Sequence, residues 1–472
     1  MPTLHIVSLG CARNEVDSEE MAARFAAAGF DLVDSSDEAE VVVVNTCGFI
    51  EAAKAESIEE ILEAAQLKDQ GGARTVIAAG CMAERYGQEL ASSLPEADAV
   101  IGFDGYDDIA DTVRRVMEGG HVAAHAPVDR RRLIPVSPVE RQIDPAIVPP
   151  WVPSHRKRLT GAPMAPLKIA SGCDRKCAFC AIPSFRGSFQ SRMPADIVRE
   201  AGWLVSQGVK ELFLVSENTT SYGKDLGIGL ESLLKDLARV DGVEWIRLSY
   251  LQPAEMRPSL IDAVAGTDHV VPYFDLPFQH ASAAVLRRMR RFGDADSFLG
   301  LLDRIRAASP EAGIRTNVIV GFPGETEQDV ETLEQFLGEA RLDAVGVFPY
   351  SDEESTEGAG LDGHLDADEI LARAADVSGF ADTVTSIRAE ERIGERVEVL
   401  VESMEEGVHA GRARQQGPED GRTYIRAPGA LTVGQIVTGE IARTDGVDWL
   451  VESEGRGTRQ RGRKPIGPDV TK

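Results

Sequence analysis

The sequence contains no apolar run of the roughly 18 to 20 residues that a membrane helix needs, and its N-terminal stretch lacks a secretion signal. We therefore expect a cytoplasmic protein with no membrane partner. Positive charge is also scarce: 77 Asp and Glu residues against 50 Lys and Arg leave a formal net charge of -27. Such a surface repels polyanions, so a basic protein is a better expected partner than bare nucleic acid.

Cysteine is sparse as well, with six in 472 residues. Without a secretion signal, these are expected to bind a metal or act in catalysis rather than form disulfides. Three of them, Cys173, Cys177 and Cys180, stand close together, and the nearest upstream histidine is His155. A structural zinc site normally takes four protein ligands, so zinc is the weaker alternative. A 4Fe-4S cluster held by three thiolates would keep one iron open for a reactive ligand.

The other three cysteines recur in a repeated unit over the first 120 residues. Each unit consists of an apolar strand ("LHIVSLG", "VVVVNT", "TVIAAG"), a cysteine (Cys11, Cys47, Cys81) and a stretch with helical periodicity. This alternation predicts an open parallel α/β sheet, in which the carboxyl ends of the strands share one edge and ligands bind there. We expect the three cysteines to meet at that edge, although a buried cysteine taken alone is often only a small apolar residue.

A second series of strands and helices begins near residue 167. The expected strands are "PLKIAS", "ELFLVS", "WIRLSY", "YFDLPF", "RTNVIV" and "AVGVFPY". Six such β/α units predict a full or partial barrel whose functional loops follow the strands. The Cys173 cluster follows the first of these strands and is therefore expected at the mouth of the barrel.

Composition divides the chain, which is long enough for about three domains. The expected division is an α/β domain (1-124), a linker rich in Pro and Arg (125-164), a barrel with a trailing helix (165-393), a small all-β barrel (394-455) and a disordered basic tail (456-472). The linker holds clusters of basic residues and many prolines, typical of a loosely draped segment. The short strands after residue 394, separated by Gly, Pro and Asp, predict the small OB-like barrel.

The spacing C-x3-C-x2-C, with Phe179 before the last cysteine, resembles the radical S-adenosylmethionine (SAM) superfamily. The resemblance implies that the open iron binds the amino and carboxylate groups of SAM. It also implies that an electron from the cluster cleaves the sulfonium to give a 5'-deoxyadenosyl radical. The low reduction potentials that 4Fe-4S clusters can reach suit this chemistry.

A narrower resemblance covers nearly the whole chain. "SLGCARNEVDSE", "VNTCGFIEAAKAES" and "GCMAERY", followed by the radical motif and a small β-barrel, look like the methylthiotransferases. That resemblance implies two 4Fe-4S clusters, SAM, and a C-terminal TRAM domain that helps to bind substrate. It further implies that Cys11, Cys47 and Cys81 hold the sulfur-carrier cluster, and that an electron donor and a sulfur source are partners.

The family has two branches, one acting on a tRNA adenosine and the other on an aspartate of small-subunit ribosomal protein S twelve. "CAIPSFRG", "FDLPFQHAS" and "RRMRR" resemble the second branch, and the acidic charge fits a basic ribosomal protein or the ribosome. The resemblance thus implies methylthiolation at the aspartate β-carbon after hydrogen abstraction. The tRNA branch is the alternative, although tRNA is the less favoured partner.

Other site residues follow from the resemblance through their places at strand ends. Glu217, Asn218, Gly321, Gly324 and Glu325 are expected to contact the cofactor from these strand ends, and Phe179 from within the cysteine motif. The two glycines could equally serve a tight β/α turn, and the two glutamates could be solvated or capping carboxylates. Two roles stay open for His280: it could face the substrate, or it could be a hydrogen-bonded histidine of the loop.

A function of a different class is a zinc-stabilised RNA-binding scaffold without catalysis. Its candidate phosphate contacts lie in the last barrel, at Arg412, Arg414, Arg422 and Arg426. Acidic residues outnumber basic ones in that segment, however, so solvated strand faces are the stronger interpretation.

Overall fold

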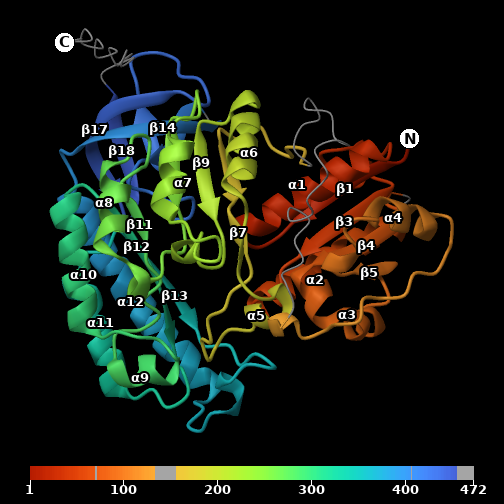
Figure 1. Cartoon of the computed structure of the whole chain (residues 1–472), viewed down its shortest axis with the longest axis horizontal. Helices are drawn as coiled ribbons and strands as arrows, with labels where there is room; N and C mark the ends of the chain where they lie inside the picture. Colours follow the sequence, from red (N-terminus) through yellow and green to blue (C-terminus); the bar gives the residue numbers. More distant parts are fainter. Residues whose placement is uncertain (70–71, 133–155, 406, 454–472) are drawn as a thin grey trace, which may run out of the picture.

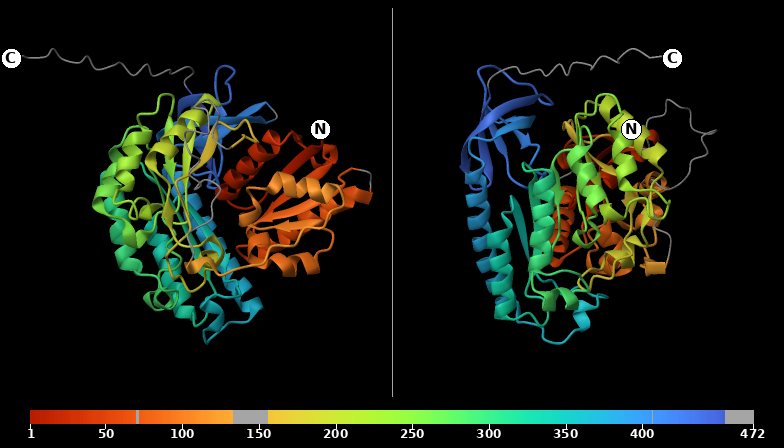
Figure 2. Two further views of the ribbon diagram at one scale, coloured as in Figure 1. Left: turned by 45° about the vertical axis from the view of Figure 1, so that its right-hand side comes forward. Right: turned by 60° about the vertical axis from the view of Figure 1, so that its left-hand side comes forward.

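A computed structural model describes residues 1-69, 72-132, 156-405 and 407-453, which form three units (Figure 1). An N-terminal α/β unit lies beside a central unit of strands and helices, and an all-β barrel sits at one end of the central unit (Figure 2). Within the described ranges, no helix is both long and apolar enough to span a membrane. The predicted basic tail and most of the predicted linker lie outside the described residues.

The N-terminal unit is an open sheet of parallel strands in the order β2-β1-β3-β4-β5. Its strands are β1 Thr3–Ser8, β2 Asp31–Leu32, β3 Val41–Thr46, β4 Thr75–Gly80 and β5 Ala99–Ile101, and its helices are α1 Ala12–Ala27, α2 Glu51–Asp69, α3 Cys81–Ser93 and α4 Ile109–Met117. Alternate residues of β3 pack on opposite faces, since Val41 and Val43 join the core with α1 and α4 while Val42 and Val44 join the core with α2 and α3. The predicted three-unit sheet is confirmed, and it gains two short strands, β2 and β5.

The central unit contains all six predicted strands in two parallel sheets, β10-β9-β6 and β11-β12-β13. An isolated parallel bridge between Ile246 and Val270 links the two sheets, which makes the six strands a partial barrel. The strands are β6 Met164–Lys168, β9 Glu211–Val215, β10 Trp245–Leu248, β11 Tyr273–Asp275, β12 Gly313–Val320 and β13 Ala344–Pro349. The helices are α5 Ile182–Arg186, α6 Pro194–Ser206, α7 Leu230–Leu237, α8 Pro258–Gly266, α9 Ala283–Arg288, α10 Ala295–Ala308, α11 Glu327–Ala340 and α12 Ala367–Glu391, and a small ribbon pairs β7 Ala170–Ser171 with β8 Gln190–Ser191.

The C-terminal unit is a closed barrel of five strands in the order β14-β15-β16-β18-β17. They are β14 Arg396–Glu405, β15 Val408–Ala413, β16 Thr423–Arg426, β17 Ile436–Asp445 and β18 Asp448–Ser453, as the sequence predicts. This barrel contacts the central strands through buried polar groups. Arg412 binds Glu211 at 2.8 Å, and the Tyr273 hydroxyl donates to Asp420 at 2.5 Å.

The central strands place apolar residues against the outer helices and polar residues on the opposite face. Leu212, Leu214 and Ile246 belong to the core with the helices, whereas Asp275 at the end of β11 is a buried carboxylate. The Tyr250 backbone N–H donates to Asp275 Oδ2 at 2.8 Å, and among the described residues Oδ1 has no hydrogen-bond partner. Burial raises the pKa of Asp275 to about 6.

Buried ion pairs join the N-terminal unit to the central unit. Arg156, at the described end of the predicted linker, binds Glu19 of α1 at 2.6 Å and Glu200 of α6 at 2.7 Å. Asp17 of α1 binds Lys168 of β6 at 2.5 Å. The downstream flank of the linker is therefore packed into the domain interface rather than loosely draped.

Replacing Arg156 tests how much this interface contributes to stability. In R156M the buried carboxylates of Glu19 and Glu200 each lose one cation, but Glu19 keeps Arg158 and Glu200 keeps Arg192. The expected cost is therefore that of lost charged hydrogen bonds, about 1.5 to 3 kcal/mol. The measurement is the first transition in urea unfolding. R199M, on the exposed side of the same helix α6, is the matched control and should unfold as wild type. A wild-type transition in R156M would contradict the structural role.

Asp275 makes stability depend on pH. Because its pKa in the folded protein is about 6, above the value in the unfolded chain, its contribution is complete below about pH 4 and is lost as the pH rises through about 6. We expect D275N, which resembles the protonated acid, to be more stable than wild type at pH 8 by up to about 3 kcal/mol. The difference should vanish near pH 4. The measurement is the free energy of unfolding in urea across this pH range, with D262N at an exposed position of α8 as the control. A constant difference in stability between D275N and wild type at every pH would contradict the assignment.

Candidate active site

The three N-terminal cysteines follow β1, β3 and β4 and meet at one edge of the sheet, as predicted. Gly10 has a φ of +81°, and a Cβ built there would lie 2.9 Å from Cys47 Sγ, so the residue before Cys11 must be glycine for the two loops to approach. Gly80 plays the same part before Cys81, because its φ is +92° and a Cβ would lie 2.5 Å from the Thr46 carbonyl oxygen. The backbone is thus built to bring these thiols together.

Electrostatics show that the three thiols influence one another. Burial, together with Cys81 and Cys11, raises the pKa of Cys47 to about 11. Burial also raises the pKa of Cys81, against the opposing effect of the Arg186 guanidinium. Burial acts in the same direction on Cys11, but Arg13 and Arg186 outweigh it and hold its pKa below the usual value. Two guanidinium groups therefore offset the negative charge that thiolate ligands would carry here.

The second triplet lies in the loop between β7 and α5, at the mouth of the partial barrel. The Arg175 backbone N–H donates to Cys173 Sγ at 3.4 Å, and Arg291 Nη1 lies 3.7 Å from Cys177 Sγ. Burial, with a contribution from Cys177, raises the pKa of Cys173 to about 11 and also raises that of Cys180. The donors directed at these sulfurs suit thiolates that bind a positively charged group.

The chemistry of the two donor sets suits iron-sulfur clusters, whose irons bind cysteine thiolates. All six cysteines are free thiols. Among the residues that the structure describes, no three His, Cys, Asp or Glu side chains are arranged to hold one metal ion, which gives no support to the zinc alternative. In a 4Fe-4S cluster each thiolate binds a different iron, so the ligands stand farther apart than around one zinc. Cluster binding by the two triplets stays a prediction.

The residues expected to contact the cofactor occupy three places. Phe179 packs against a small apolar cluster that includes Ala178 and Phe322. Glu217, at the end of β9, forms a buried ion pair with Arg13 of the N-terminal unit. Asn218 is engaged within its own loop, since it donates to Ser221 at 2.8 Å and accepts from Thr220 at 2.5 Å.

The loop after β12 is held together by its own side chains. Both carboxylate oxygens of Glu325 accept from the Gly321 N–H at 2.9 Å, and Arg373 pairs with the same carboxylate at 3.0 Å. Gly324 has a φ of +82°, as a tight turn requires. His280 is fully buried 3.4 Å from Glu325, and its Nδ1 accepts from the Ser282 N–H at 3.0 Å. These contacts favour a structural role for His280 and Glu325; a cofactor contact for Glu325 stays a prediction.

Sequence reasoning missed Arg186, which lies in α5 six positions after Cys180. Its Nη2 donates to Cys81 Sγ at 3.0 Å, and its Nη1 binds Asp17 at 3.0 Å. The quoted segment "CAIPSFRG" contains this arginine, but its partners are 105 and 169 positions away in the chain. No local pattern could have revealed them.

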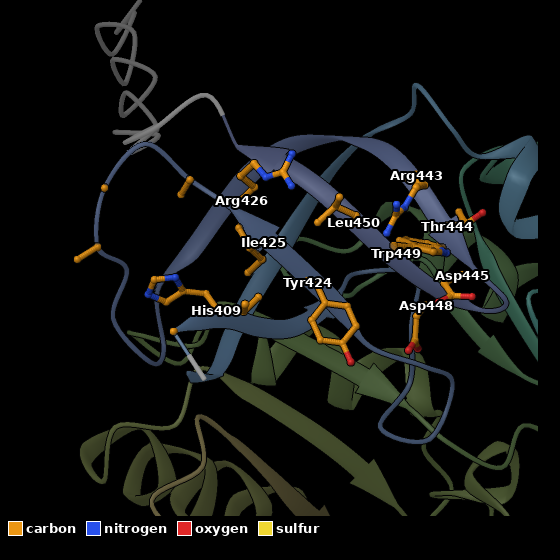
Figure 3. Close-up of a pocket in the computed structure, with 15 residues that line it drawn as sticks. His409, Tyr424, Ile425, Arg426, Arg443, Thr444, Asp445, Asp448, Trp449 and Leu450 are labelled. Carbon is orange, nitrogen blue, oxygen red and sulfur yellow. The ribbon is translucent and has the colours of Figure 1, made fainter. Parts of the chain in front are cut away.

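The C-terminal barrel carries a groove of about 660 Å³ across β16 and β18. In Figure 3, Tyr424 and Trp449 line it, with His409 and Arg426 toward one side and Asp445 and Asp448 toward the other. The four arginines considered for phosphate contacts do not form a free basic patch. Arg412 pairs with Glu211 and Glu402, Arg414 with Glu398 and Arg426 with Glu452, and Arg422 also has an interaction.

Comparison with known proteins shows which families this chain resembles. Three family models match: uncharacterized protein family UPF0004 at residues 3-102, the radical SAM superfamily at 167-337 and the TRAM domain at 393-453. The radical SAM match implies SAM and a 4Fe-4S cluster as cofactors. Among solved structures, a radical SAM methyltransferase, TsrM from Kitasatospora setae, shares the fold with a TM-score of 0.52 at 16% identity, covering 74% of this chain and 75% of that one.

Curated relatives extend over almost the entire sequence. A ribosomal protein uS12 methylthiotransferase RimO from Cutibacterium acnes is 58% identical over 94% of this chain and 97% of its own length. Proteins of the same name from Nocardioides sp. and Streptomyces coelicolor are 58% and 55% identical over 94% and 95% of this chain, and over 95% and 96% of their own lengths. The chain therefore belongs to the family of radical SAM methylthiotransferases named for ribosomal protein uS12.

Proposed function

We propose that this protein is a cytoplasmic enzyme that adds a methylthio group to the β-carbon of an aspartate in ribosomal protein uS12. One observation carries the proposal: Arg186, from the helix after the radical motif, donates a hydrogen bond to Cys81 of the N-terminal triplet and so connects the two three-thiol sites. The chain that holds both sites is 58% identical to a relative named for this activity. An isolated radical SAM site would account for the barrel triplet alone. The second triplet supplies a separate place for the sulfur.

Under this proposal Cys173, Cys177 and Cys180 hold the radical-generating cluster, and Cys11, Cys47 and Cys81 hold a second one. When bound, the first would supply the electron that cleaves SAM, and the second would supply the site for the transferred sulfur. The protein's own residues orient and shield these sites. The buried pair of Arg13 and Glu217 connects the sheet edge with the end of β9, and Phe179 packs against the apolar cluster that includes Ala178 and Phe322.

The partner is proposed to be a basic ribosomal protein, free or within the ribosome. The net charge of -27 supports a basic partner. Helix α2 begins just after the Cys47 loop and carries Glu56, Glu59, Glu60 and Glu63, which adds four carboxylates to the element that follows the proposed sulfur site. The pairing of the C-terminal arginines with carboxylates supports this branch over tRNA. Electron donor and sulfur source belong to the reaction as further partners.

The substrate is tested by mass spectrometry of ribosomal proteins and tRNA nucleosides from cells with and without the gene. We expect the deletion to remove one methylthio group from an aspartate of uS12 and to leave tRNA unchanged. Complementation with the wild-type gene should restore the group, and complementation with C47A should not. Loss from a tRNA adenosine instead would keep the chemistry and overturn the substrate.

The two triplets are tested by iron and sulfide counts on anaerobically reconstituted protein. Wild type should hold about eight irons, and C11A/C47A/C81A and C173A/C177A/C180A should each hold about four. Only the second variant should lose cleavage of SAM, whereas both should lose methylthiolation. Zinc in place of iron, or an unchanged iron count in either variant, would contradict the assignment.

A further inference from the structure

Arg186 belongs to the central unit, but its side chain ends inside the N-terminal unit. It is buried, and its guanidinium lies 4.3 Å from the ring centroid of Phe103. The Nη2 group donates to Cys81 Sγ at 3.0 Å and to Asn14 Oδ1 at 3.3 Å. Among the described residues, the bond to Cys81 is the shortest hydrogen bond from a side chain to a cysteine sulfur.

The backbone that carries Arg186 is tied to the other triplet. Gly187, the next residue, accepts a hydrogen bond from the Cys173 N–H at 3.0 Å and has a φ of +84°, which ends α5. A continuous connection therefore runs from Cys173 through Gly187 and Arg186 to Cys81. The segment that presents the radical-site thiols also supplies a donor to a thiol of the second site.

The orientation of the guanidinium is fixed by Asp17. Its carboxylate binds Arg186 Nη1 at 3.0 Å on one side and Lys168 Nζ at 2.5 Å on the other. Since Lys168 shares the charge of Asp17, the guanidinium keeps a net positive effect on the sulfur. In a buried setting of low dielectric this effect is large compared with that of an exposed charge.

A donor to a ligating sulfur has two physical effects. It orients the ligand, and it stabilises the more negative, reduced state of a cluster, which raises the reduction potential. We propose that Arg186 is a positioning residue of the sulfur-carrier site, which holds the Cys81 thiolate for its cluster and makes that cluster easier to reduce. This inference rests on the proposed function, because it needs a cluster at the N-terminal triplet.

Arg156 offers the matched control. Like Arg186, Arg156 is buried and forms an ion pair with helix α1 across the domain interface, to Glu19 where Arg186 binds Asp17. It also binds Glu200 of α6, and within the described part of the chain it makes no hydrogen bond to a cysteine. A purely structural role of Arg186 should therefore be reproduced by R156M. A role toward the sulfur should appear in R186M alone.

The experiment uses the full-length C173A/C177A/C180A protein, in which only the N-terminal cluster can form. R186M, R186K and R156M are added to this parent and reconstituted anaerobically. Their reduction is followed by electron paramagnetic resonance during titration with dithionite, and iron release to a chelator is timed. R186M should shift the midpoint to lower potential and weaken iron retention roughly ten- to hundred-fold. R186K, which keeps a cationic donor, should lie between R186M and the parent, and R156M should match the parent.

The outcomes separate this inference from the proposed function. If R186M matches R156M in potential and iron retention, Arg186 is only a structural link and the inference is wrong. If the parent itself holds no iron, the second cluster and this inference fail together. Should R186M not fold, R186K decides the question, because a parent-like potential and release rate in a variant with altered donor geometry would also overturn the role.

Discussion

The architecture depends on a buried carboxylate between two cations. Asp17 of α1 binds Lys168 of the first barrel strand and Arg186 of the helix after the radical motif. Burial alone would raise its pKa, but the two cations outweigh burial and lower it to about 2. Asp17 is therefore ionised under all physiological conditions, and it ties the N-terminal sheet to both the wall and the mouth of the barrel.

Buried ion pairs of this kind fix the orientation of the two units more than they stabilise the fold. Buried ion pairs recover little net free energy, since desolvation offsets their attraction, yet an unpaired member is costly. A shifted domain arrangement would separate Asp17, Arg13 or Glu19 from their partners and leave buried charges alone. The interface thus excludes alternative arrangements of the two thiol sites.

The sequence predicts most of the scaffold and little of this interface. Apolar runs such as "VVVVNT" and "TVIAAG" predict strands, and a cysteine after each run must lie at the shared edge of a parallel sheet. Strands β2 and β5 have two and three residues, too short to give a pattern. Asp17 and Glu19 stand in a charged helical segment that resembles a solvated face, because their partners lie more than 130 positions away. Similarly, nothing local distinguishes a turn-holding Glu325 from one that contacts a cofactor.

The choice of arginine at position 186 follows from the geometry of its neighbours. One guanidinium serves Asp17 through Nη1 and both Asn14 and Cys81 through Nη2, while its plane lies near the ring of Phe103. A lysine ammonium is a compact, strongly hydrated charge that could not satisfy this planar set of partners from one position. The same side chain therefore closes the domain interface and sets the charge around a thiol. A change at this one position therefore alters the domain interface and the sulfur environment together.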